Sequence, residues 1–96
     1  MNLYFGHPEA LSKVIGYWIL QFSFPNGYTV KVSRNLTFPN SDSWKASLMH
    51  KDHEIHDTAI VYDGNYLANG ETDPNQTAEE IEAYLAAVQA LPFRHH

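Results

Sequence analysis

Histidine and carboxylate side chains are concentrated in one short segment of the chain, residues 50–57. The three histidines recur at three-residue intervals, and three acids stand between or beside them: His50, Asp52, His53, Glu54, His56 and Asp57. Imidazole and carboxylate groups are ligands that zinc, nickel and copper accept in proteins, and histidine also changes its charge near neutral pH. The segment therefore supports one hypothesis of function, a metal-binding or pH-responsive module.

Whether these histidines can act together depends on how the strands around them pair. The flanking residues 44–49 and 58–62 have the composition of strands, so a hairpin is expected. If His50 pairs with Ile55, then His50 and His56 lie on opposite faces, and the segment is only a polar hairpin tip. If His50 pairs with His56, the two imidazoles share a face and can chelate together. Both registers stay open, and we assign neither a metal nor any other cofactor.

The rest of the chain offers no complete set of catalytic groups. It has no cysteine, which excludes thiol nucleophiles and zinc–thiolate sites. It also lacks a glycine-rich phosphate loop and the motif that surrounds a nucleophilic serine. The adjacent acids Glu79 and Glu80 have a simpler role at a helix N-terminus, where the helix dipole favours negative charge. We therefore expect a binding protein and not an enzyme.

The charged residues are divided unevenly along the chain. The formal net charge is −5, but residues 1–51 carry +3, whereas residues 52–93 contain nine acids and no lysine or arginine. Direct binding to nucleic acid depends on lysine and arginine contacts to phosphates, so it is not expected of this chain. No apolar stretch approaches the length that spans a membrane. The acidic half instead favours a partner protein with a basic surface.

The partner-binding site is expected in this acidic half, around Tyr66. Tyrosine is favoured in interfaces because it offers a large rigid surface with a polar tip. In the alternative interpretation, Tyr66 and Leu67 fold down over the edge of the core. The predicted partner-binding residues are Asp63, Tyr66, Glu71, Asp73, Glu79, Glu80 and Glu82.

Two predicted hairpins supply the sheet that positions these residues. The first joins strands at 17–24 and 28–33 through Asn26-Gly27, which is typical of a two-residue type I′ turn, and its even-numbered face is expected in the core. The second joins 44–50 to 55–63 and ends at the Asp63-Gly64-Asn65 turn.

Two helices are predicted to flank the sheet. The segment His7–Gly16 has Pro and Glu at its start, three apolar residues at helical spacing and Gly at its end, so it predicts a short helix over the other face of the first hairpin. Near the C-terminus, Thr77 and Glu80 form a capping box, and Pro92 closes the helix. Its apolar stripe consists of Ile81, Tyr84, Leu85, Val88 and Leu91. The predicted fold class is α+β, with an antiparallel sheet of about four strands under a C-terminal helix.

We expect one domain over residues 1–96, since chains of this length form a single core. Residues 1–6 and 94–96 are set aside, as either derived from cloning or disordered. The chain shows no secretory signal, so a cytoplasmic protein is expected.

In size and layout the chain is similar to several phage-encoded inhibitors, including some anti-CRISPR proteins. The resemblance rests on a small, acidic, cysteine-free domain with a strand hairpin and a capped terminal helix, and on no specific residues. It implies an acidic face that occupies the lysine- and arginine-rich nucleic-acid site of a larger protein. A third hypothesis is a small structural or homo-oligomerising domain, in which a free strand edge at 28–33 or 44–50 pairs with a second copy as a homodimer.

Overall fold

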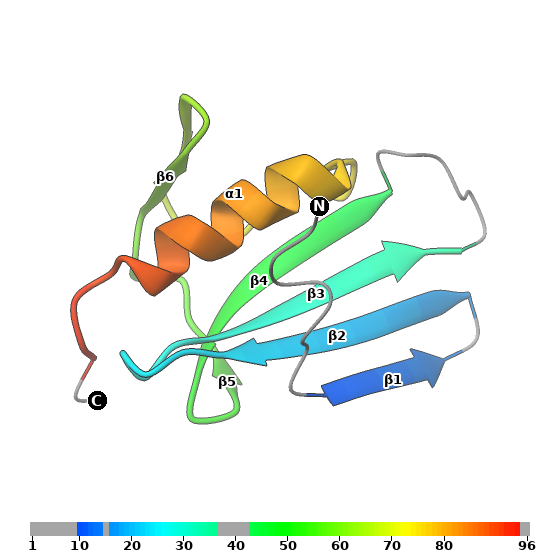
Figure 1. Ribbon diagram of the computed structural model, residues 1–96, viewed down its shortest axis with the longest axis horizontal. Coiled ribbons are helices and arrows are strands. Elements are labelled where there is room, and N and C mark those ends of the chain that lie inside the picture. The colour runs from blue at the N-terminus through cyan, green and yellow to red at the C-terminus, as the bar shows by residue number, and fades with distance from the viewer. Residues whose placement is uncertain (1–9, 15, 37–42, 95–96) are drawn as a thin grey trace.

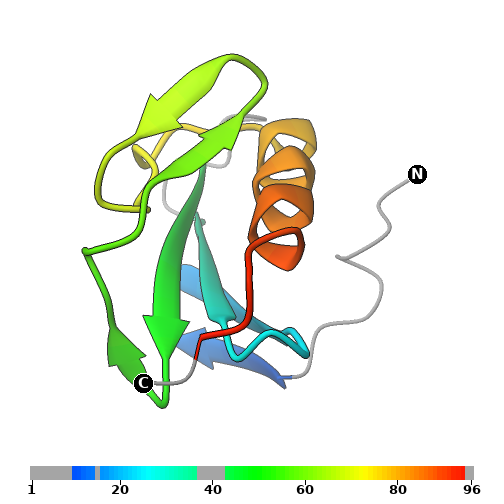
Figure 2. The same cartoon turned by 90° about the vertical axis from the view of Figure 1, so that its left-hand side faces the viewer.

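The computed structural model describes residues 10–14, 16–36 and 43–94, which form two antiparallel sheets and one helix (Figure 1). The larger sheet follows the order of the chain: β1 (Ala10–Val14), β2 (Tyr17–Ser23), β3 (Thr29–Asn35), β4 (Trp44–His50) and β5 (His53–Glu54). The smaller sheet is a hairpin of β6 (Ile60–Tyr62) and β7 (Asn65–Leu67), followed by helix α1 (Ala78–Gln89). Helix α1 crosses one face of the large sheet, with the β6–β7 hairpin beside it (Figure 2). The α+β class is confirmed.

The N-terminal strand differs from the prediction of a helix over residues 7–16. In the described part of that segment, β1 pairs with β2 along its whole length, from Ala10 opposite Gln21 to Val14 opposite Tyr17. A two-turn helix satisfies few of its own backbone groups, whereas the outer edge of β2 supplies a ladder of hydrogen bonds. The remaining residues of the predicted helix, 7–9 and 15, lie outside the described residues.

The first hairpin is confirmed, but its turn is not of type I′. Gly27 has a φ of 91°, and Asn26 is not among the described non-glycine residues with positive φ. The backbone N–H of Gly27 donates to the Phe24 carbonyl at 3.1 Å, and that of Phe24 donates to the Tyr28 carbonyl at 2.9 Å. The loop therefore has three residues, Pro25 to Gly27. Proline fits the first central position of a type I turn, and such a turn is commonly followed by glycine in the left-handed region.

The second hairpin adopts neither of the two predicted registers. His50 pairs with His53 and Met49 with Glu54, across a two-residue turn in which Lys51 and Asp52 have φ of 51° and 64°. Both central residues are left-handed, as a type I′ turn requires. The chain then leaves the sheet after β5, and the β6 strand pairs with β7 instead of β4.

Strand β5 covers only the end of β4, at Met49 and His50, and the segment before helix α1 covers the rest of that edge. The backbone N–H of Thr72 donates to the Ala46 carbonyl at 3.0 Å, and the Thr72 hydroxyl accepts from the Ala46 N–H at 2.9 Å. Gln76 and Trp44 exchange two backbone hydrogen bonds of 2.9 and 3.0 Å. Since β3 lies between β2 and β4, neither edge expected to pair with a second copy is free in the described structure.

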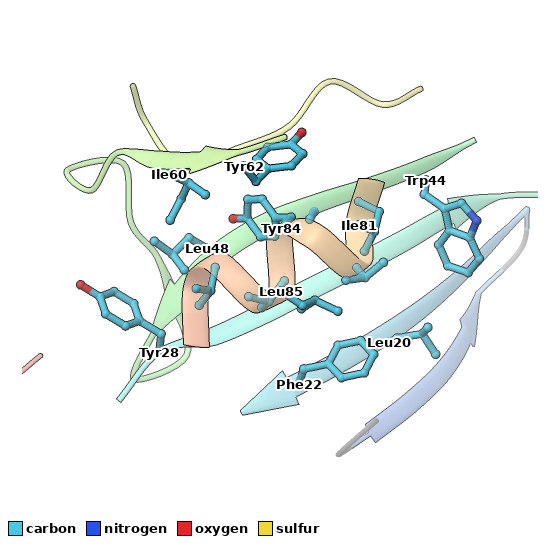
Figure 3. Close-up of a cluster of buried hydrophobic side chains, with 14 residues drawn as sticks. Leu20, Phe22, Tyr28, Trp44, Leu48, Ile60, Tyr62, Ile81, Tyr84 and Leu85 are labelled. Carbon is cyan, nitrogen blue, oxygen red and sulfur yellow. The ribbon is translucent and has the colours of Figure 1, made fainter. Parts of the chain in front are cut away.

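The core lies between the large sheet, helix α1 and the β6–β7 hairpin (Figure 3). As predicted, even-numbered residues of the first hairpin face inward, among them Leu20, Phe22, Val30 and Val32. From the other elements the buried apolar residues are Tyr28, Trp44, Ala46, Leu48, Ile60, Tyr62, Ile81, Tyr84, Leu85 and Val88. The rings of Tyr62 and Tyr84 meet edge to face with centroids 5.6 Å apart. This aromatic pair fixes the hairpin against the helix.

Helix α1 begins as predicted, at a complete capping box. The Glu80 N–H donates to the Thr77 hydroxyl at 3.1 Å, and the Thr77 N–H donates to the Glu80 carboxylate at 3.0 Å. Four of the five predicted stripe residues are buried, and Leu91, just beyond the helix, is half-buried. Among the described residues, no helix has the length and apolar character that a bilayer crossing demands.

Candidate protein-interaction site

The β6–β7 hairpin presents two apolar side chains to solvent. Its strands are joined by Asp63-Gly64, both with positive φ, and Val61 lies directly opposite Tyr66. Alternation along the strand turns Ile60 and Tyr62 into the core and leaves Val61 on the outer face. Val61 is 61% exposed and Tyr66 is 69% exposed. The two side chains thus form a contiguous apolar pair on the outside of the molecule.

The exposure of Tyr66 excludes one of the two interpretations of this residue. Tyr66 does not fold down over the core edge, whereas its neighbour Leu67 is half-buried and packs against the core. Val61 was missed by the sequence analysis. The signal was present, because the alternation of Ile60, Val61 and Tyr62 on a strand must place the middle residue on the opposite face from its neighbours.

Three of the predicted acids lie near the inner side of this hairpin. The Tyr62 hydroxyl donates to the Gln76 side-chain oxygen at 2.7 Å. Burial raises the pKa of Tyr62, and the negative charges of Glu80, Asp73 and Asp63 raise the same pKa further. These carboxylates come from the start of α1, the loop before it and the hairpin turn. The structure therefore brings residues from three separate segments to one region of negative potential.

The remaining predicted acids are placed differently. Glu79 is exposed in the first turn of α1, and Glu82 is half-buried on the same helix. Glu71 forms an ion pair with Lys45, whose ammonium nitrogen lies 2.9 Å from the Glu71 carboxylate. This contact lowers the pKa of Glu71. Because Lys45 pairs with Ser33 on the sheet face opposite α1, Glu71 is held at a different surface from the hairpin acids.

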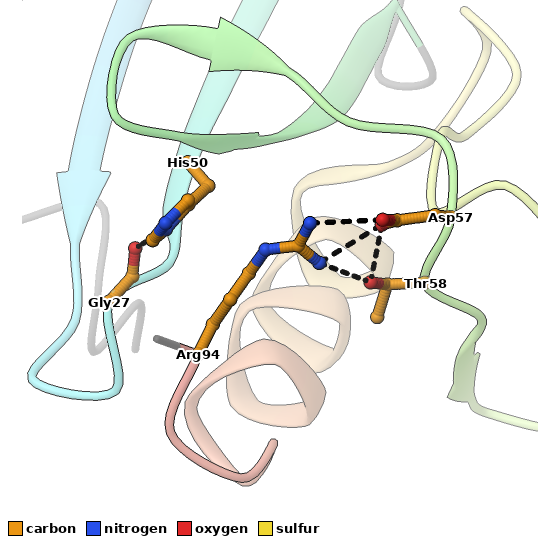
Figure 4. Close-up of polar contacts among 5 residues, drawn as sticks. All are labelled: Gly27, His50, Asp57, Thr58 and Arg94. Carbon is orange, nitrogen blue, oxygen red and sulfur yellow. Dashed lines mark hydrogen bonds and ion pairs between the residues drawn. The ribbon is translucent and has the colours of Figure 1, made fainter. Parts of the chain in front are cut away.

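The histidine-rich segment does not form a three-ligand site. His50 is buried, and its Nδ1 lies 2.8 Å from the Gly27 carbonyl oxygen (Figure 4). A carbonyl only accepts, so Nδ1 carries the hydrogen and donates. His53 and His56 are exposed. Within residues 10–14, 16–36 and 43–94, no three histidine or acidic side chains are arranged to hold a metal ion.

Arg94, which the sequence analysis set aside with the tail, is part of the folded structure. Its backbone N–H donates to the Asn26 carbonyl at 2.9 Å. Its guanidinium group donates to both oxygens of the Asp57 carboxylate, at 3.0 and 2.9 Å, and to the Thr58 hydroxyl at 3.3 Å (Figure 4). The pKa of Asp57 is lowered to about 2, chiefly by the hydrogen bonds from the Arg94 guanidinium and then by the one from the Thr58 hydroxyl. The segment between β5 and β6 is thereby fastened to the end of the chain.

Comparison with protein-family models, with curated proteins and with solved structures finds no match for this chain.

Proposed function

We propose that the protein is a small protein-binding module whose β6–β7 hairpin docks onto a basic surface of a partner protein. The observation that carries the proposal is the cross-strand pair of Val61 and Tyr66, which are largely exposed on a hairpin that lies at one side of the core (Figure 2). An exposed aromatic beside a β-branched residue is a suitable centre for an interface. Both side chains are dehydrated when a partner binds, and both lose little conformational entropy because they have few rotamers.

Carboxylates on the hairpin turn and on the segments that follow it define the kind of partner. Asp63 is exposed at the hairpin turn, Asp73 is exposed in the loop before α1, and Glu79 is exposed at the start of the helix. Carboxylates at the rim of an apolar contact attract lysine and arginine and accelerate encounter at low ionic strength. Glu71 contributes less, because Lys45 already neutralises it.

The proposal extends to inhibition. A partner that holds nucleic acid through lysine and arginine presents the surface chemistry that complements this acidic hairpin. Occupation of that surface excludes the nucleic acid by direct competition. In this proposal the protein acts in the cytoplasm by binding, without catalysis, in the manner of a phage-type or mobile-element inhibitor.

The test is capture of partners from a host lysate with wild-type protein and with the double variant Val61→Ser, Tyr66→Ser. Phe93→Ser is the matched control, because Phe93 is also an exposed aromatic (58% exposed) but lies beyond the C-terminal end of α1. The proposal expects a partner that is retained by wild type and by the control, lost with the double variant, and displaced by added nucleic acid. A partner retained by the double variant as well as by wild type contradicts it.

Homodimerisation is a second candidate, and the position of β1 favours it. In the described structure β1 is an outer strand of the large sheet, hydrogen-bonded only to β2. The unpaired backbone groups of such an edge can pair with the same strand of a second copy. If this edge pairs, light scattering of the purified protein should give twice the monomer mass. A measured mass equal to that of the monomer would exclude homodimerisation.

A further inference from the structure

The face of the large sheet opposite helix α1 contains a pocket that the proposed function does not use. The pocket has a volume of about 280 Å³ and is lined by Tyr17, Ser33, Asn35, Ser43, Lys45 and Pro74. The register explains how these residues meet. Tyr17 pairs with Asn35 across β2 and β3, and Ser33 pairs with Lys45 across β3 and β4, so all four share the face that α1 leaves uncovered.

The pocket combines one aromatic wall with several hydrogen-bonding groups. Tyr17 is 44% exposed, which leaves part of its ring available to a ligand. Hydroxyl, carboxamide and ammonium groups come from Ser33, Ser43, Asn35 and Lys45, and Pro74 adds an apolar side. A concave site with a few convergent polar groups and an apolar wall is the usual form of a small-molecule site, and this volume is near the lower end of the usual range.

The charge of the pocket argues against an anionic ligand. The one cation among the described residues that line it, Lys45, is held by Glu71 at 2.9 Å, and the lowered pKa of Glu71 keeps that carboxylate ionised. A phosphate or carboxylate would share Lys45 with Glu71 and be repelled by it. The Lys45 ammonium nevertheless has three donors and can donate to an uncharged oxygen while it stays paired with Glu71.

We propose that this pocket binds a neutral sugar ring. A pyranose has an apolar C–H face that stacks on an aromatic ring and a perimeter of hydroxyls that both donate and accept hydrogen bonds. Tyr17 would support the apolar face, and Ser33 and Lys45 would bond the perimeter. The pocket is too small for more than one ring, so the ligand is a free monosaccharide or the terminal unit of a longer glycan.

Titration of the isotope-labelled full chain, followed by the amide shifts of its backbone, tests the proposal. The probes are glucose, galactose, mannose and N-acetylglucosamine, with oligosaccharides ending in the same units as a second arm. At least one sugar should give saturable shifts at Tyr17, Ser33 and Lys45, with the millimolar affinity expected of a small ligand in a shallow site. Tighter binding of the oligosaccharide identifies a glycan end as the ligand, and equal binding identifies the free sugar.

Three variants make the test specific. Tyr17→Ala should weaken binding about tenfold through loss of the stacking wall. Ser33→Val should abolish binding, because it replaces a hydroxyl that lines the pocket with a larger apolar side chain, which suits a strand and so preserves the fold. Lys31→Ala, an exposed residue of β3 outside the pocket, should leave the affinity unchanged. The absence of saturable shifts with every sugar overturns the proposal, as does binding that survives in Ser33→Val. Tighter binding of inorganic phosphate or adenosine also overturns it.

Discussion

The side-chain amide of Asn26 donates a hydrogen bond of 2.8 Å to the carbonyl oxygen of Val88, so the turn of the first hairpin caps the C-terminal end of helix α1. The same nitrogen also lies within hydrogen-bonding distance of the Gln89 and Leu91 carbonyls, at 3.3 and 3.0 Å. The last carbonyls of a helix have no partners within it, so a donor from elsewhere in the fold stabilises that end. One asparagine therefore links residues more than sixty positions apart in the chain.

Replacement of Asn26 should destabilise the whole domain. Asn26→Ala should lower the free energy of unfolding by about 1–3 kcal/mol, because partly buried carbonyls at the helix end lose their donor. Urea unfolding followed by circular dichroism measures the change. The control is Asn75→Ala, an exposed residue of the loop before α1, which should stay within about 0.5 kcal/mol of wild type. Equal stabilities of the two variants would contradict a capping role for Asn26.

Two glycines with nearly the same φ allow the cost of a left-handed backbone to be distinguished from the cost of a steric clash. Gly64 and Gly70 have φ of 76° and 78°. A Cβ at Gly64 meets nothing within 4 Å, whereas one at Gly70 lies 2.9 Å from the Thr58 carbonyl oxygen and 3.4 Å from Leu48. Gly64→Ala should cost about 1–2 kcal/mol of stability from the left-handed conformation alone. Gly70→Ala should cost about 2–5 kcal/mol, because overpacking adds to that strain.

The measurement is thermal or urea unfolding of the two alanine variants in parallel. Gly70 also accepts a hydrogen bond from the Tyr84 hydroxyl through its carbonyl, so a shift of this backbone disturbs the core directly. If Gly64→Ala proved as destabilising as Gly70→Ala, the close approach of Gly70 to Thr58 would not matter to stability.

The ion pair of Asp57 with Arg94 predicts a specific dependence on pH. The pKa of Asp57 falls from 3.8 to about 2 because Arg94 and Thr58 donate hydrogen bonds to its carboxylate. A lowered pKa in the folded state contributes stability above the unfolded value, and that contribution is lost as the pH falls through the folded value. Asp57→Asn should therefore destabilise the protein at pH 7, and the difference from wild type should shrink between pH 4 and pH 2.

Urea unfolding at several pH values gives this difference for each variant. Asn75→Ala, an exposed residue without an ionisable side chain, serves as the control, and its difference from wild type should not follow the same course. A difference for Asp57→Asn that stays constant from pH 7 to pH 2 would show that Asp57 contributes no proton-linked stability.

Charge at the hairpin turn should control the rate of partner binding. Asp63→Lys should slow association several-fold at low ionic strength, because an acid at the rim of the interface steers a basic partner. The rate is measured by surface-immobilised binding kinetics at two salt concentrations with the partner obtained by capture. Glu54→Lys, a change of the same charge on exposed β5, should have little effect. Association that is insensitive to both salt and Asp63→Lys would exclude electrostatic steering by this surface.

The sequence predicted the parts of the fold where local chemistry and tertiary packing agree. Thr77 and Glu80 define the start of α1 without help from the rest of the chain. In β2, the alternation of residue types along the strand predicts which face is buried. The segment 10–14 was predicted wrongly because its apolar spacing suits a helix, whereas the unpaired edge of β2 offers a better set of backbone partners. That competition is decided by the sheet and not by the segment itself.

In the second hairpin and at the candidate site, too, features set by local sequence were predicted and features set by distant residues were not. Asp63-Gly64 is a recognisable type I′ pair, and the turn was predicted there. Lys51-Asp52 adopts the same conformation with residues that seldom signal it, so neither of the two predicted registers was right. Exposure of Tyr66 was one of the two interpretations that the sequence allowed, whereas the ion pair of Glu71 with Lys45, a residue distant in sequence, could not be predicted from local pattern.

The most direct test of the proposed interaction surface is hydrogen–deuterium exchange of the protein, alone and in complex with the captured partner. The account predicts new protection in residues 60–67 of the β6–β7 hairpin and around Asp73, with the exchange of β2 and β3 unchanged. Protection confined to the large sheet, with none in residues 60–67, would contradict it.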